Sequence, residues 1–117
     1  MNQIDLNDWL DVVDQEEQLR SQLQVSLEQY RQAITELLTL ANMRCGSSVC
    51  AAYVLLSLYD GDNWKVDLAD VCCRLDGHYF SQVLIAMRGR GLLLKEPHSV
   101  VQNGSQRFKA LSEEWSI

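Results

Sequence analysis

The hydrophobic positions in the first third of the chain recur at steps of three and four residues, the period of an amphipathic helix. Over residues 9–42 this pattern runs from Trp9 and Val13 to Ala41, with glutamine, glutamate and serine on the other faces. Glu16 and Arg20 fall on the apolar stripe and weaken it near its start. The spacing therefore predicts one long N-terminal amphipathic helix.

From residue 23 onward the stripe follows about three heptads, which is the lower limit for a coiled coil. Two interpretations stay open: the helix packs on its own domain, or it pairs with a second copy in a homodimer. The candidate dimerisation residues are Leu23, Leu27, Tyr30, Ile34 and Leu37.

Three shorter helices are predicted beyond the break at residues 44–48. Residues 49–59 are apolar almost all round, which is typical of a central core helix. Residues 67–75 and 79–88 follow, with Asp67 as a start signal and an Asp-Gly break between them. In the last of these helices we expect the inner face to hold Phe80, Val83, Leu84 and Met87, and Gly89 and Gly91 to end it.

The pattern then changes to short candidate strands. Residues 92–95 and 107–111 are the two candidates, and Asn103-Gly104 between them is a strong turn signal. Ser112 is a suitable cap for a last helical turn through Trp115. The expected fold class is therefore mainly α, with a small two-stranded β wing.

The order helix, helix, turn, helix, strand, turn, strand is that of a winged helix-turn-helix. The phrases VDLADVCCRL at residues 66–75, SQVLIAMRGRGLL at 81–93 and QRFKALSEE at 106–114 resemble the winged helix of bacterial regulators of the MarR and GntR type. The resemblance is one of pattern and covers residues 49–115. It divides the chain into an acidic helical arm, 1–44, and a winged helix domain, 45–117.

The resemblance implies a dimeric, DNA-binding transcriptional regulator that reads duplex DNA with the helix 78–88 and the wing 95–107. The residue types fit, because glutamine and arginine make paired hydrogen bonds with adenine and guanine edges, and other polar groups hold phosphates. The candidate DNA-binding residues are His78, Ser81, Gln82, Ile85, Arg88, Arg90, Lys95, Gln102, Asn103, Gln106, Arg107 and Lys109.

The charge distribution supports a second hypothesis. The chain has a net charge of −6, and residues 1–44 hold eight acidic residues against three arginines, whereas residues 74–109 hold six basic residues against two acidic ones. An acidic arm repels phosphates unless it points away from them. The alternative is therefore a protein-interaction adaptor or inhibitor, of the phage or mobile-element type such as an anti-CRISPR or antirepressor, which binds a protein partner and no DNA.

No catalytic motif is recognisable, so we expect neither an enzyme nor a cofactor. The four cysteines are Cys45, Cys50, Cys72 and Cys73. Their spacing differs from the paired ligands of structural zinc, and we expect buried, reduced thiols rather than a metal site. Cys45 lies close to a helix N-terminus, where the pKa of a thiol falls. No signal peptide or membrane-spanning stretch is visible, which indicates a cytoplasmic protein without a membrane partner.

Overall fold

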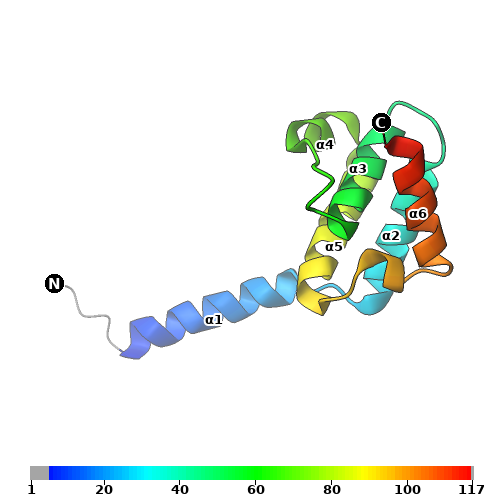
Figure 1. Cartoon of the computed structure of the whole chain (residues 1–117). Helices are drawn as coiled ribbons and strands as arrows, with labels where there is room; N and C mark the ends of the chain where they lie inside the picture. Colours follow the sequence, from blue (N-terminus) through cyan, green and yellow to red (C-terminus); the bar gives the residue numbers. More distant parts are fainter. Residues whose placement is uncertain (1–5, 117) are drawn as a thin grey trace.

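The computed structural model of this protein describes residues 6–116, which form six α-helices and one short 3₁₀ helix (Figure 1). The elements are α1 Leu6–Gln22, α2 Leu27–Ala41, α3 Ser48–Tyr59, α4 Leu68–Arg74, α5 Gly77–Leu93, η1 Pro97–Ser99 and α6 Gly104–Trp115. The mainly α class is confirmed. The helices predicted over 49–59 and 67–75 are also confirmed, and Asp67 caps α4 by accepting hydrogen bonds from the N–H groups of Ala69 and Asp70.

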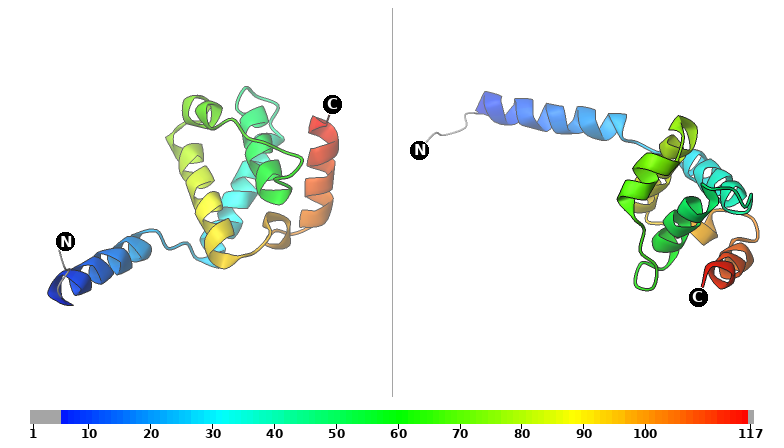
Figure 2. Two further views of the ribbon diagram at one scale, coloured as in Figure 1. Left: turned by 60° about the vertical axis from the view of Figure 1, so that its left-hand side comes forward. Right: turned by 90° about the horizontal axis from the view of Figure 1, so that it is seen from above.

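Helices α2, α3, α5 and α6 form a bundle, which we call the body, and α4 lies across one end of it (Figures 1 and 2). α2 packs against both α3 and α5, while α6 packs against α3 and η1. The core is made of large side chains that are fully buried, including Leu37, Leu38 and Leu55. Burying one such side chain contributes about 1.5–3 kcal/mol, so the body is the part of the chain that holds its own fold.

The contact between α2 and α5 depends on small residues. The ring of Tyr30 in α2 lies against Gly89 in α5, where an added Cβ would be 2.6 Å from the Cδ1 atom of Tyr30. The Tyr30 hydroxyl donates a hydrogen bond to the carbonyl oxygen of Lys95 at 2.8 Å. Burial raises the pKa of Tyr30 to about 12. The buried residues of α5 are Val83, Ala86 and Gly89.

These buried residues correct the expected inner face of the helix. Val83 is buried, but Leu84 and Met87 are exposed, because the small residues Ala86 and Gly89 let α2 approach the other side. The glycines do not end the helix, which continues through Leu93. Helix interiors tolerate glycine at a cost of about 1 kcal/mol, and here the close approach of Tyr30 offsets it.

The predicted β wing is wrong, because no strand occurs among residues 6–116. Residues 92–93 still belong to α5, which ends where Leu94 adopts the left-handed conformation with φ 56°. Residues 107–111 lie inside α6, and so does Ser112. The chain does turn at Asn103, which is also left-handed, and Gly104 follows because a Cβ there would be 1.7 Å from the carbonyl oxygen of His98.

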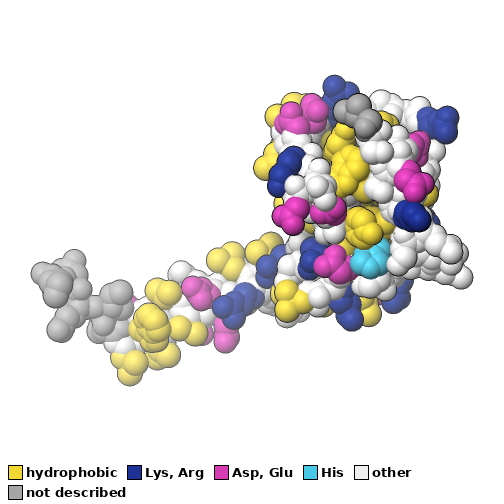
Figure 3. All heavy atoms as spheres, viewed as in Figure 1, with side chains coloured by type: hydrophobic (Ala, Val, Ile, Leu, Met, Phe, Trp, Pro, Cys, Tyr) yellow, Lys and Arg dark blue, Asp and Glu magenta, His cyan; other side chains and the backbone are white. Residues whose placement is uncertain are grey.

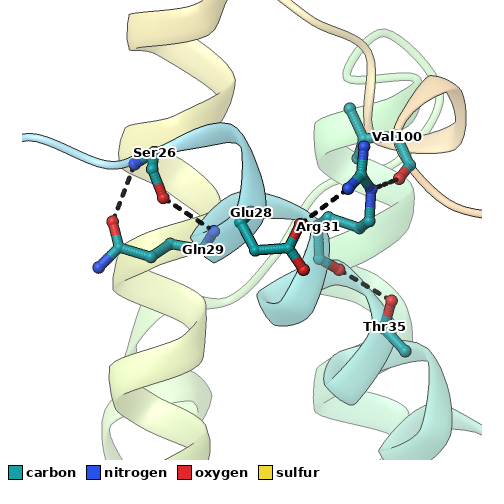
Figure 4. Close-up of polar contacts among 6 residues, drawn as sticks. All are labelled: Ser26, Glu28, Gln29, Arg31, Thr35 and Val100. Atoms are coloured by element: carbon teal, nitrogen blue, oxygen red, sulfur yellow. Dashed lines mark hydrogen bonds and ion pairs between the residues drawn. The ribbon is translucent and has the colours of Figure 1, made fainter.

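The long N-terminal helix is divided in two at residues 23–26. Ser26 begins α2, with its Oγ accepting from the Gln29 N–H at 3.1 Å while Gln29 Oε1 accepts from the Ser26 N–H at 2.8 Å (Figure 4). This capping box satisfies two backbone donors at a helix start. Close by, Arg31 Nε donates to the Val100 carbonyl at 2.9 Å and ties α2 to the segment after η1.

The body begins with α2, whose residues lie within the predicted arm, 1–44. Tyr30, Ile34 and Leu37, three of the candidate dimerisation residues, are fully buried within their own chain. These three residues of α2 therefore pack against other helices of their own chain, whereas Leu23 and Leu27 remain exposed. No helix within residues 6–116 is both long and apolar enough to span a membrane.

Candidate interaction surface

Helix α1 extends away from the body, and none of its residues is buried (Figures 1 and 3). Leu6, Trp9, Leu10 and Val13 follow the i, i+3, i+4, i+7 spacing that places side chains on one face of a helix. Trp9 is 57% exposed and Leu10 50% exposed. Val12 and Leu19 are also exposed, but they lie on other sides of the helix, Leu19 opposite Leu10. We call Leu6, Trp9, Leu10 and Val13 the α1 apolar face.

The rest of the α1 surface is acidic and polar. Asp8, Asp11 and Asp14 recur every three residues away from the apolar face, whereas Glu16 and Glu17 follow Trp9 and Leu10 by seven residues and continue the line of the face with negative charge. The only basic residue of α1 is Arg20, so its five carboxylates give a net charge of −4. α1 therefore combines an uncovered apolar stripe with a strong negative charge.

The end of α1 is joined to the body through α5. Arg88 Nε donates a hydrogen bond to the carbonyl oxygen of Leu23 at 3.0 Å. Beside this bond lies a groove of about 170 Å³, lined by residues 22–25 together with Leu84, Ile85 and Arg88. Leu84 is 52% exposed, and Met87 on the same helix is 47% exposed. The outer side of α5 is thus a second apolar surface, and it starts where α1 meets the body.

Three of the predicted DNA-binding residues make polar contacts within the chain. His78 Nε2 lies 3.0 Å from Oε2 of Glu36, and Arg90 forms an ion pair with Glu96 at 2.8 Å. Arg88 is held by its bond to the connection after α1. Arg90 is therefore neutralised locally, and His78 and Arg88 are directed toward partners in their own chain.

The other candidates fall into two groups, one in the first half of α5 and one around η1 and the start of α6. Ser81 is exposed and Gln82 is half-buried near its start, and Ile85 is half-buried in the groove. Around η1 and the start of α6, Arg107 is half-buried and the exposed candidates are Lys95, Gln102, Asn103, Gln106 and Lys109. At 1.5 Å per residue, Ser81 and Ile85 lie roughly 18 Å and 12 Å before the last residue of α5, Leu93, so the helix separates the two groups along its axis.

The cysteines differ from the expectation of buried thiols. Cys50 is buried, and burial raises its pKa, whereas Cys45, Cys72 and Cys73 are exposed free thiols. The pKa of Cys45 is lowered, as expected, chiefly because the Ser48 hydroxyl lies 3.4 Å from its sulfur. Within residues 6–116 no cluster of three or more potential ligands is arranged to hold a metal ion.

Sequence reasoning found half of the α1 apolar face. It noted Trp9 and Val13 but left Leu6 and Leu10 out of any site, because Glu16 and Arg20 interrupt the stripe. The i, i+3, i+4, i+7 spacing of its four members was the signal available. Nothing in the sequence marked Leu84 and Met87 as exposed, because their burial depends on which side of α5 meets α2.

Comparisons with known proteins give one finding. The family model DUF7673, described as a family of unknown function, matches residues 31–116, which cover α2 after its first turn and the rest of the body but not α1. No curated protein and no solved structure matches the chain. Since the match spans well over half of the sequence, this protein belongs to the DUF7673 family.

Proposed function

We propose that this protein is a protein-interaction module that holds its partner through α1 and catalyses no reaction. The observation that carries the proposal is the α1 apolar face, of which no residue is buried. Soluble monomers rarely leave a contiguous apolar surface uncovered, and such surfaces commonly mark binding sites. Because α1 does not bury this face within its own chain, the face is best explained as the binding site for a partner.

The spacing of the face indicates how the partner is bound. Leu6, Trp9, Leu10 and Val13 have the anchor pattern of a helix that docks into a hydrophobic groove or against another helix. Trp9 is the strongest anchor candidate, since tryptophan is enriched among residues that dominate binding energy. The partner is expected to present an apolar surface of similar length.

The charge indicates the partner's chemistry. Five carboxylates surround the apolar face against one arginine, so basic side chains beside an apolar strip complement α1. Charge complementarity speeds association and rejects acidic partners, and its effect weakens as salt is added. The partner class is therefore a basic amphipathic protein segment.

A designed peptide tests this class directly. The probe is a fluorescent three-heptad peptide with leucine at the a and d positions and lysine at the exposed positions, titrated with the full chain and followed by fluorescence anisotropy. We expect saturable binding that weakens with salt, and loss of at least about tenfold in affinity for the double variant Trp9→Ala/Leu10→Ala. Alanine keeps the helix propensity of these positions, so helicity is retained.

Two controls make the result decisive. Asn7→Ala/Gln15→Ala changes the polar side of α1 and should leave peptide affinity unchanged. A scrambled peptide of the same composition measures non-specific charge attraction. If the scrambled peptide binds as tightly, or if Trp9→Ala/Leu10→Ala binds as well as the natural chain, the proposal is wrong.

Duplex DNA is a second candidate partner, because α4 and α5 are joined by a turn of only two residues, Leu75 and Asp76. The helices of a helix-turn-helix are joined by a turn of about three or four residues, which is close to the connection seen here. The test is a salt titration of binding to random duplex DNA. Micromolar binding at about 50 mM salt that falls steeply with salt, and is lost in Gln82→Ala/Arg88→Ala, supports this candidate. Absence of binding at that salt concentration excludes it.

A further inference from the structure

The outer side of α5 is a second apolar surface that its own chain leaves uncovered. Leu84 and Met87 point away from α2 and are about half exposed, while Ser81 and Gly91, which continue the same line, are small and exposed. The groove lined by Leu23, Leu84 and Ile85 extends this surface to the end of α1. We call Ser81, Leu84, Ile85, Met87, Arg88 and Gly91 the α5 outer face.

The charge of this face is opposite to that of α1. Helix α5 has no acidic residue, and its two arginines are Arg88 and Arg90. Arg90 is neutralised by Glu96, but Arg88 takes part in none of the ion pairs among the described residues. Arg88 lines the groove together with Leu84, and its guanidinium has donors left over after its bond to the Leu23 carbonyl.

The two helices that carry these faces also match in length. α1 and α5 each have 17 residues, which corresponds to about 25 Å at 1.5 Å per residue. Because α1 leaves the body at the groove and runs outward, it does not lie along the α5 of its own chain (Figures 1 and 2). The two faces can nevertheless meet between two copies.

We propose that the partner of α1 is a second copy of this chain: the α1 apolar face of each copy docks on the α5 outer face of the other. This inference rests on the proposed function and names the partner of the same site. The arrangement is reciprocal and closed, as in most homodimers, and it leaves neither face exposed. It places the acidic α1 beside Arg88, whereas pairing two α1 helices would bring two charges of −4 together.

The area is sufficient for a weak dimer. A strip about 25 Å long and about 10 Å wide is roughly 250 Å², and a reciprocal dimer covers four such strips, about 1,000 Å² in total. That is the lower end of the area found in specific interfaces. We therefore expect a dimer that dissociates in the micromolar range and weakens with salt.

A charge exchange between two variants tests the arrangement. The first, Glu16→Lys/Glu17→Lys, reverses charge beside the α1 apolar face, and the second, Arg88→Glu, reverses it on the α5 outer face. Sedimentation velocity should show a dissociation constant raised at least about tenfold for each variant alone. Mixing the two should restore association, because each reversed face then meets its complement. Lys109→Glu changes an exposed side chain of α6, serves as the matched control, and should leave the dissociation constant unchanged.

Since Arg88→Glu also breaks the bond to Leu23, the exposed Leu84→Glu serves as a second variant on the same face and should also weaken the dimer. Pairing of α1 with α1 predicts instead that neither Arg88→Glu nor Leu84→Glu has an effect, and that result overturns the inference. A chain that stays monomeric yet binds the basic peptide also overturns it, and leaves the proposed function standing. If the natural dimer is dissociated by that peptide, both proposals are supported.

Discussion

Helices α1 and α2 follow one another in the chain, have similar lengths of 17 and 15 residues, and both carry an apolar stripe. α2 buries seven of its residues and α1 buries none. The difference lies in what each stripe meets. α2 finds Ala86 and Gly89 on α5, small enough for close approach, together with the apolar side chains of α3. An apolar stripe is thus a requirement for packing, and the neighbouring surface decides whether it becomes core or stays a docking site.

The largest expected effect is the difference in unfolding free energy between a leucine-to-alanine substitution in α2 and the same substitution in α1. Leu37→Ala removes a fully buried side chain of α2 and should lower the free energy of unfolding by about 2–5 kcal/mol, since it leaves a cavity. Leu10→Ala in α1 should change it by less than about 0.5 kcal/mol, because the side chain is half exposed. Urea unfolding of both variants measures the contrast. A cost for Leu10→Ala near that of Leu37→Ala would mean that α1 packs on the body.

Two glycines of α5 give the next contrast. Gly89→Ala places a Cβ against the ring of Tyr30 and should cost about 1–3 kcal/mol through overpacking. Gly91→Ala has open space and should stabilise the chain by about 0.5–1 kcal/mol, because alanine favours the helix. Thermal unfolding of the pair reports the sign. If both variants were stabilised, Tyr30 could not be seated on Gly89 as described.

These contrasts also show how far the sequence predicts the fold. The helices at 49–59 and 67–75 were predictable, since long apolar runs and the capping residue Asp67 are local signals. The capping box of Ser26 and Gln29 was equally local, and it was overlooked because the heptad spacing continues across it. The wing was predicted from Asn103-Gly104, but a turn signal does not specify whether a strand or a helix comes after the turn. Here Gly104 begins α6 because the His98 carbonyl leaves no room for a Cβ.

The candidate site was predictable only in part. The acidic character of the arm could be predicted because it follows from composition. The apolar face could also have been predicted from the helical spacing of Leu6, Trp9, Leu10 and Val13. The exposure of Leu84 and Met87 could not, because a count of large apolar residues favours burying them. Helix α5 instead places its smallest residues toward α2, because the ring of Tyr30 in α2 lies against Gly89.

The buried hydroxyl of Tyr30 makes the stability of the body depend on alkaline pH. The pKa of Tyr30 is raised from 10.0 to about 12, so from about pH 10 to 12 the unfolded chain has lost a proton that the folded chain keeps. The contribution of Tyr30 is complete below about pH 10 and falls by about 1.4 kcal/mol per pH unit above it. Urea unfolding across this window should show the stability gap between the natural chain and Tyr30→Phe shrinking. A constant gap would indicate that the hydroxyl reaches solvent.

The smallest expected effect concerns the boundary between α1 and α2. Ser26→Ala removes the Oγ that accepts the Gln29 N–H and should lower the free energy of unfolding by about 1 kcal/mol, the usual value of a serine cap. Ser21→Ala, on exposed α1, is the matched control and should stay within about 0.5 kcal/mol of the natural chain. Hydrogen exchange at Gln29 and Tyr30 provides the local readout, since fraying of the first turn of α2 exposes those amides. If Ser26→Ala left both stability and exchange unchanged, the backbone at 23–26 rather than the serine cap would separate the docking helix from the body.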